Sequence, residues 1–295
     1  MVFKYSSHMK LCHKVIQGLI FPVIIVTACS KELDIQIPEP ESKLVVEGWI
    51  EQGKPARVLL TQSVPFFSSL DSAALMEIPV THARVTLITE TEHEILTLIP
   101  NVSFFPPYVY NSTEIKGSVN TRYRLEVEYR GEKLAASTTI PDPAFLDSIW
   151  YVAEPGYDSL GRIWIQFTDN PLTVDYYKIL TQTVGQDKRY IPTRDISTFS
   201  DRYFSGETIK FGLLRGMGTI LELGEDQLFR LGDTVNIKFC TMDEAHYTFW
   251  NSVQSMIISS SNPYAASFET VQSNVLGGYG VWGGYGSSYY TFIVR

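Results

Sequence analysis

A regular alternation of apolar and charged residues over positions 122–130 constrains the fold more than any other stretch. Every odd position from Tyr123 to Tyr129 is apolar, and arginine or glutamate fills the positions between them. Successive side chains of a β-strand point to opposite faces, so this period of two predicts one buried face and one wet face. Gly131 and Glu132 then turn the chain into another strand-like run.

Similar runs surround this stretch. The segment KLVVEGWIEQGKPARVLLTQS reads as a hairpin around a Gly-Lys-Pro turn, and VTHARVTLIT, HEILTLI and KLAASTTI read as further strands. Strands this frequent, with no strong helix among them, predict an antiparallel, immunoglobulin-like β-sandwich over residues 43–141. The segment LDSAALMEI fits a short helix or a loop, and propensity does not decide between them.

A Pro-Asp-Pro sequence at 141–143 marks the expected domain boundary, because proline holds the chain extended and lacks a backbone donor. Residues 142–295 are expected to form a second β-rich domain. Its strand candidates are DSIWYVAE, RIWIQFT, DYYKILTQT, ETIKFGL, TVNIKFCT and a C-terminal strand after GGYGVWGGYG. The fold class is therefore mainly β, with two sandwich-like halves.

One amphipathic helix is expected at about 242–257 in the second half. Thr241 and Glu244 have the spacing of a capping box. Apolar residues recur on one face at positions 242, 245, 249, 253, 256 and 257, and a Ser-Ser-Ser-Asn-Pro sequence ends the pattern.

The first 28 residues have the layout of a removable secretory signal. A basic start precedes an apolar stretch from Val15 to Val26, which is too short to span a bilayer comfortably. The following Val26-Thr27-Ala28-Cys29 resembles the lipobox of bacterial lipoproteins. Only a thiol can form the thioether to diacylglycerol, so Cys29 is the expected lipidation site, and two or three acyl chains together hold a protein on a membrane.

Residues 29–42 are expected to form a flexible acidic tether, because their proline-spaced, charged composition cannot bury apolar surface. The acidic residues behind Cys29 resemble the surface-export signal of Bacteroidetes lipoproteins, with Leu33 interrupting the match.

Removal of the signal leaves 21 basic and 32 acidic residues, a net charge of −11. This balance argues against a nucleic-acid partner. Cys12 leaves with the signal and Cys29 is lipidated, so Cys240 stays alone and no disulfide can form within the mature chain. Cys240 sits in a strand-like run, where a small packed residue is the expected role.

Three stretches, LVVEGWIEQGKPARVLLTQS, IPDPAFLDSIW and SNVLGGYGVWGGYG, behind a lipobox, resemble a Bacteroidetes family of outer-membrane lipoproteins known as domain of unknown function 4249. The resemblance implies an accessory role beside a TonB-dependent transporter or another outer-membrane protein. It implies no catalytic residues.

No catalytic spacing stands out among the mature histidines His82, His93 and His246. HExxH is absent, and Glu92-His93-Glu94 lies in an expected strand, where the three side chains cannot converge on a metal. No Gly-x-Ser-x-Gly elbow occurs, and the glycine-rich segments 277–280 and 283–286 lack the lysine of a phosphate cradle, so bulges or tight turns are favoured there.

Two aspartate pairs, Asp142 with Asp147 and Asp169 with Asp175, fit no ligand motif and are expected to be solvated loop acids. We therefore expect no metal, no cofactor and no enzymatic activity. The alternative hypothesis is a hydrolase that acts on external polysaccharide or peptide. A third hypothesis is a purely structural envelope protein.

Aromatic residues provide the candidate binding surface. The run FFPPYVYN places Phe104, Phe105, Tyr108 and Tyr110 around a Pro-Pro pair between two expected strands. Loops on rigid sandwiches often carry binding sites, and exposed rings suit sugars or proteins. The competing interpretation is that these rings fold back into the core. We expect a binding or assembly role at the outer membrane, facing either the cell surface or the periplasm.

Replacing Cys29 by alanine is predicted to release the protein from membranes and to abolish acyl labelling, because the thiol that carries the lipid is lost. Membrane fractionation with radiolabelled palmitate measures both. Unchanged membrane retention of Cys29→Ala would contradict lipidation at this residue.

Overall fold

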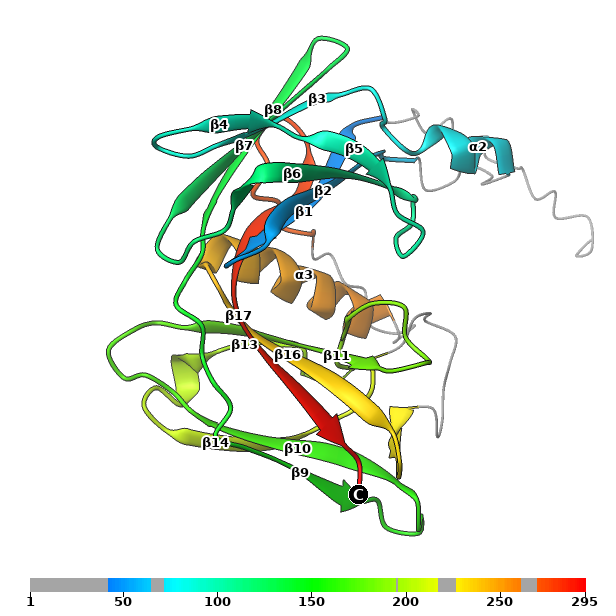
Figure 1. Ribbon diagram of the computed structural model, residues 1–295, viewed down its shortest axis with the longest axis vertical. Helices are drawn as coiled ribbons and strands as arrows, with labels where there is room; N and C mark the ends of the chain where they lie inside the picture. The colour runs from blue at the N-terminus through cyan, green and yellow to red at the C-terminus, as the bar shows by residue number, and fades with distance from the viewer. Residues whose placement is uncertain (1–41, 65–71, 195, 217–226, 261–269) are drawn as a thin grey trace, which may run out of the picture. The chain divides into compact units, whose positions relative to one another are not determined.

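The computed structural model describes residues 42–64, 72–194, 196–216, 227–260 and 270–295 (Figure 1). The signal, Cys29 and the tether up to residue 41 lie outside this range, so the expectations for them stay predictions. Within the described part, no helix combines the length and apolar character needed to cross a bilayer.

The protein is mainly β, as predicted, and a nine-stranded sheet is its largest element. In spatial order its strands are β12 (Ile191–Pro192), β11 (Tyr176–Thr183), β16 (Thr234–Met242), β17 (Tyr279–Ile293), β1 (Leu44–Glu51), β2 (Pro55–Gln62), β6 (Tyr108–Lys116) and β5 (Thr97–Pro100), with β13 (Thr198–Ser200) paired to β11. All neighbours pair antiparallel except β1 and β17, which run parallel.

Two four-stranded sheets accompany the long one. One consists of β4 (His93–Ile95), β3 (Arg84–Ile88), β7 (Arg122–Tyr129) and β8 (Glu132–Thr139). The other centres on β10 (Leu160–Thr168), which pairs with β9 (Ser148–Ala153), β14 (Thr208–Leu213) and β15 (Phe229–Arg230). The helical elements are α2 (Ser72–Glu77), the 3-10 helix η1 (Asp201–Tyr203) and α3 (Glu244–Ser260).

The long sheet takes strands from both sides of the boundary predicted at 141–142. Strand β17 is the joining element, because it pairs with β16 of the second half and with β1 of the first (Figure 1). Residues 140–147 lie between β8 and β9 and contain no regular element. The immunoglobulin-like detail of the first half stays a prediction.

Two hydrophobic cores lie on one face of the long sheet. The first contains residues of β1, β2, β3, β7 and β8 together with Trp282 of β17, and the second contains residues of β10, β11 and β16, with Tyr290 and Phe292 of β17 packed against it. Because Trp282, Tyr290 and Phe292 are spaced by even numbers, one face of β17 serves both cores. The opposite face of the long sheet does not contact either of these two cores.

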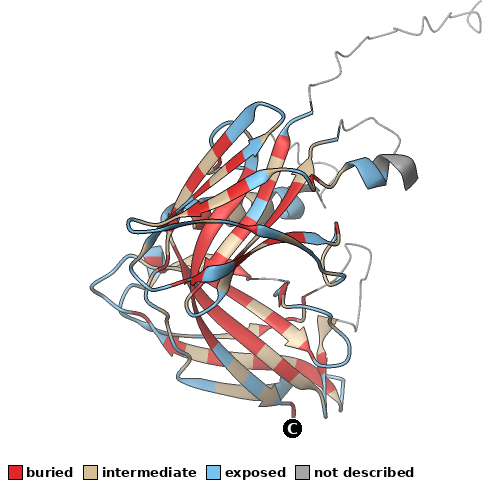
Figure 2. Cartoon of the chain, turned by 45° about the horizontal axis from the view of Figure 1, so that its top comes forward, coloured by how far each residue is buried: buried red, intermediate tan, exposed pale blue. Residues whose placement is uncertain are grey.

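The predicted alternation at 122–130 is confirmed. Tyr123, Leu125 and Val127 of β7 are buried, and the strands of Figure 2 show the same alternation of buried and exposed positions. The hairpin of β1 and β2 is likewise observed. The sequence does not predict strand β6. Two prolines directly precede it, and its polar NSTE centre hides the alternation of apolar and polar residues. The segment that fitted a helix or a loop contains the short helix α2.

Helix α3 exists where one was predicted, but its cap is different. Asp243 caps the helix, since its Oδ1 accepts a hydrogen bond of 2.9 Å from the backbone nitrogen of His246. The predicted capping box of Thr241 and Glu244 is wrong, because β16 continues through residue 242. The Thr241 hydroxyl instead donates to the Asp142 carbonyl at 2.6 Å.

The expected apolar face of α3 is also wrong. Ala245 is exposed and Ile257 is 50% exposed, whereas His246 is only 1% exposed. The helix packs against β17 through the face that carries His246, because Gly283 leaves room there for the imidazole. The available space on the sheet, more than the hydrophobic pattern, orients the helix.

Replacing Gly283 by alanine is predicted to destabilise the protein by about 1 to 3 kcal/mol, the usual cost of overpacking. The added Cβ would lie 2.0 Å from His246 Nδ1, so α3 would have to move. Thermal unfolding measures the loss.

Gly212→Ala is the matched control. Gly212 lies in β14, where an added Cβ would come no closer than 3.1 Å to the Arg162 side chain and to the Trp164 ring, so only a shift of a few tenths of an ångström is needed. Equal melting temperatures for the two variants would contradict the close packing of α3 on β17.

Candidate ligand-binding cavity

A cavity of about 620 Å³ lies on the face of the long sheet opposite the two cores. Strands β1, β2, β11, β16 and β17 contribute side chains to it, and α3 contributes His246 and Trp250. The loop at 101–104, Lys54 and the segment 188–192, which includes β12, also line it. Its volume is typical of sites that hold small organic ligands.

Strand alternation explains how polar residues reach this cavity. In β1, Val46 and Ile50 enter the first core, while Glu47, Trp49 and Glu51 point to the opposite side and line the cavity. The same alternation occurs in β11 and β16. Lys178 and Lys238 point to the cavity, and the residues on either side of each lysine belong to the second core. The same strands thus build a core and a polar cavity on their two faces.

A buried ion pair joins two of these strands. Lys238 Nζ of β16 lies 2.5 Å from Glu51 Oε1 of β1, and both side chains are more than 90% buried. The Tyr289 hydroxyl donates to the same carboxylate, and Lys54 lies 3.4 Å from it. Burial alone would raise the pKa of Glu51, but the Lys238 charge and these hydrogen bonds lower it overall. Glu51 is therefore a satisfied anion.

Lys178 differs from Lys238 because it has no such partner. It is 2% exposed and lines the cavity from β11, and its ammonium makes no hydrogen bond or ion pair within the described residues. Its Nζ lies 3.3 Å from the centre of the Trp250 ring, a cation–π contact. Burial, with a smaller effect from the Lys238 charge, lowers the pKa of Lys178 well below its usual value, although the charges of Cys240 and Glu47 oppose the shift.

His246 supports this wall of the cavity. Its Nε2 accepts a hydrogen bond of 3.0 Å from Trp250 Nε1, and its ring packs 4.5 Å from the Tyr285 ring. Nδ1 lies against Gly283 and has no hydrogen-bond partner of good geometry among the described residues. Burial and the charge of Lys178 lower the pKa of His246 to about 3, and the Gly284 backbone offsets a small part. The imidazole is therefore neutral and orients Trp250.

Glu47 is the second carboxylate of the cavity and faces its open space. Glu47 is exposed to the cavity, yet desolvation by the protein around it raises its pKa, while the charges of Arg189 and Lys178 oppose the shift. No ion pair holds Glu47 in the described part of the chain.

The four predicted aromatic residues separate into different roles. Phe104 lines the cavity, 5.7 Å from the Trp49 ring and 5.5 Å from the Arg189 guanidinium. Phe105 is 68% exposed and Tyr108 is 40% exposed, and neither lines the cavity. Tyr110 is buried in the first core.

The hydroxyl of Tyr110 donates to the Val80 carbonyl and accepts from the Ala83 nitrogen, both at 3.0 Å. Tyr108 and Tyr110 belong to β6, so only Phe104 and Phe105 lie in the expected loop.

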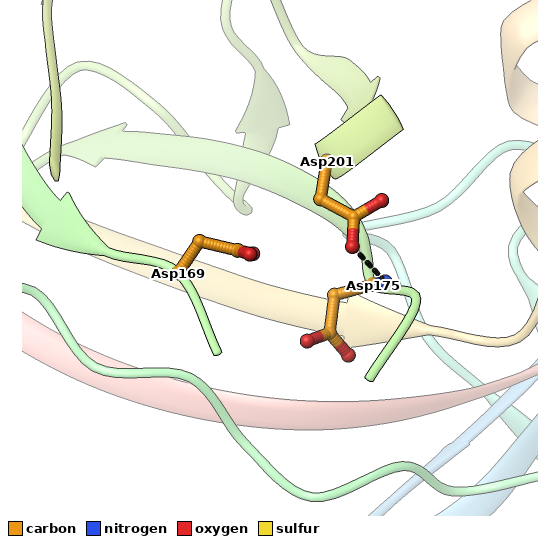
Figure 3. A group of neighbouring side chains, drawn as sticks. All are labelled: Asp169, Asp175 and Asp201. Carbon is orange, nitrogen blue, oxygen red and sulfur yellow. Dashed lines mark hydrogen bonds between the residues drawn. The ribbon is translucent and has the colours of Figure 1, made fainter. Parts of the chain in front are cut away.

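Three aspartates converge outside the cavity, including the pair Asp169 and Asp175 (Figure 3). Asp201 joins them, and one carboxylate oxygen of each lies within 4.8 Å of the others. Asp169 and Asp201 are buried, so the expectation of solvated loop acids is wrong for Asp169. The fold brings them together because residues 169–175 and η1 both pack beside β11.

Hydrogen bonds within the protein already occupy this acidic cluster. Asp169 accepts from the Tyr177 hydroxyl and the Gly206 nitrogen, and Asp201 accepts from the Asp175 nitrogen at 2.8 Å. Burial raises the pKa of Asp175, Thr173 opposes the shift, and the neighbouring carboxylates add to it. The cluster ties two loops to the sheet.

Several other residues that the sequence offered as candidates for chemistry lie within strands. His93 lies on the short strand β4, and the neighbouring Glu94 accepts hydrogen bonds from the backbone nitrogens of Thr113 and Ile115. Cys240 is fully buried, as its strand-like sequence predicts, and lies 3.4 Å from Ser287 Oγ. The segment 283–286 belongs to β17, so it is not a phosphate loop.

Residues 30–291 match the family described as Domain of unknown function (DUF4249). This range includes every residue of the cavity and almost all of the folded chain. The chain belongs to this family. No curated protein matches the sequence significantly. The DUF4249 match supplies no activity, so the cavity's chemistry rests on its own residues.

The sequence contains a signal for this site that motif spacing does not reveal. The strands VVEGWIE, YYKILTQ and NIKFCT each place a charged residue inside an apolar run. When one face of a strand packs in the core, a charged residue on its other face indicates a polar site or an ion pair. Recognising the cavity also required knowing that the three strands share one sheet.

Acid is predicted to destabilise the protein through His246. As the pH falls below about 6.5 the unfolded chain gains a proton that the folded protein excludes until about pH 3. Stability is therefore lost as the pH decreases across this window, by up to about 1.4 kcal/mol per pH unit. Chemical denaturation from about pH 7 to about pH 4 should show a shallower loss for His246→Gln, whose amide oxygen can still accept from Trp250.

His93→Gln is the control, because it makes the same substitution at a histidine that is exposed on β4. Parallel stability curves for wild type and His246→Gln would contradict a buried neutral imidazole.

Proposed function

We propose that this chain is a lipid-anchored protein of the outer membrane or cell surface that binds a small ligand without catalysis, as an accessory to uptake through a TonB-dependent transporter. The observation that carries the binding role is the cavity with Lys178 at its wall, a buried amine whose charged form no ion pair stabilises in the described protein. Burying such a charge is costly unless a partner compensates it, so the site favours a ligand that does so.

The contacts of the other polar groups support binding over catalysis. His246 Nε2 already accepts from Trp250, and the pKa of this imidazole is too low for it to act as a base near neutral pH. Burial raises the pKa of the Cys240 thiol, which disfavours the thiolate needed for nucleophilic attack. Glu51 is held by Lys238 and Tyr289. These groups shape and charge the cavity, and none is poised as a nucleophile.

The proposed location rests on the sequence before the folded part. The lipobox ending at Cys29 precedes an acidic tether, and the DUF4249 match begins at residue 30, directly after that cysteine. A tether at this position would hold the cavity away from the bilayer. This arrangement suits a protein that presents a ligand to a membrane transporter.

Purification of the full chain from native membranes in a gentle detergent, followed by mass spectrometry, tests both parts of the proposal. We expect a small molecule to leave the wild-type protein on denaturation, and a transporter to co-purify. Leu180→Trp should abolish recovery of the small molecule, because Leu180 lines the cavity from β11 and an indole there would fill it.

Val152→Trp is the matched control, since Val152 is 43% exposed on β9 and does not line the cavity. Wild type that carries no ligand, or ligand that Leu180→Trp retains, would contradict binding in the cavity. Recovery of the protein without any transporter would contradict the accessory role and leave the binding result intact.

A further inference from the structure

We infer that the cavity selects an organic anion: a carboxylate, sulfonate or phosphate group at Lys178, joined to a flat apolar body that lies against the aromatic side chains. This inference rests on the proposed binding function and adds the chemical class of the ligand. It follows from the charges of the cavity, their pairing and the positions of the rings.

The cavity is positively charged within an acidic protein. The whole chain has a net charge of −8. In the described residues six basic side chains line the cavity, against two carboxylates, and His246 is neutral. The basic residues are Lys54, Arg57, Lys178, Lys188, Arg189 and Lys238. A concave site lined by one sign of charge concentrates ligands of the opposite sign.

Pairing within the protein leaves most of this positive charge uncompensated. Lys238 and Lys54 both lie against Glu51, so these two cations share one carboxylate within the protein. Arg57, Lys178, Lys188 and Arg189 form no ion pair in the described part of the chain. The single remaining carboxylate, Glu47, cannot neutralise four cations. A negative group on the ligand would meet uncompensated charge.

Lys178 is the most constrained of the four cations. Lys188 and Arg189 are exposed, so water compensates their charges, whereas Lys178 is 2% exposed. Among the described residues, the partner of its ammonium is the face of Trp250, which His246 holds in place. A charge-assisted hydrogen bond from the ammonium to a ligand oxygen would supply the missing acceptor, and such bonds are stronger than those between neutral groups.

Rings provide the second half of the recognition. Trp49, Phe104 and Tyr190 line the cavity, and the Phe104 ring contacts both the Trp49 ring and the Arg189 guanidinium. Aromatic faces contribute most against flat apolar surfaces. A small inorganic anion would leave these contacts unused, so the site favours an anion that carries a ring or a similar flat body.

Two fluorescent probes separate the charge from the ring. Anilinonaphthalene sulfonate carries both features, and phenylnaphthylamine has the same rings without the sulfonate. Fluorescence titration of the full-length protein should show about tenfold tighter binding of the sulfonate probe, the factor that one charged hydrogen bond supplies. Lys178→Met should remove most of this preference and leave the neutral probe within about twofold of wild type.

Lys178→Met is also expected to raise the melting temperature, because it removes an unpaired buried charge and keeps the apolar stem. A higher melting temperature with weaker sulfonate binding identifies a ligand-directed residue, and near-ultraviolet circular dichroism confirms that the variant is folded. Lys133→Met is the control, since Lys133 lies on β8, is 78% exposed and does not line the cavity.

The outcomes distinguish this inference from the proposed function. Equal affinities for the two probes, or an unchanged preference in Lys178→Met, would overturn the anionic ligand class and leave the binding cavity standing. Failure of both probes to bind wild type would count against the cavity as a ligand site.

Discussion

The parallel pairing of β1 with β17 is the constraint on which the structure depends. It aligns seven residue pairs, from Val45 with Tyr279 to Glu51 with Tyr285, between strands at the two ends of the folded chain. Without it β1, β2, β6 and β5 would form one sheet and β11, β16 and β17 another. With it, the two cores share one continuous sheet, and the opposite face becomes a single surface wide enough to contain a cavity.

That second face explains why charged residues occur in the centre of the protein. The ion pair of Lys238 with Glu51 crosses β17, so it forms only when both strands flank that strand. Glycines make the arrangement possible, since Gly48 accommodates Trp282 on the core side and Gly283 accommodates His246 on the cavity side. Small residues on β1 and β17 thus allow large side chains to pack on both faces.

Stability and binding compete at this surface. An unpaired buried lysine and a buried neutral histidine each weaken a fold relative to apolar residues of similar size. The protein retains both beside Trp250, where the histidine orients the ring that contacts the lysine. A ligand anion would compensate the charge of the lysine, so the polar surface can contribute to ligand binding. The acidic cluster around Asp201 differs, because hydrogen bonds from the protein already satisfy its carboxylates.

The sequence by itself determined the local features of this protein. Its period-two patterns specify strands such as β7, its turn residues specify the first hairpin, and its apolar recurrence indicates a helix near α3, because these signals depend on neighbouring residues. Only the tertiary structure decided that β17 joins the two halves, that α3 packs through His246, and that Lys178, Lys238 and Glu51 face one cavity. Those outcomes depend on strand pairing and on available space between residues far apart in the chain, and a local pattern carries no information about either.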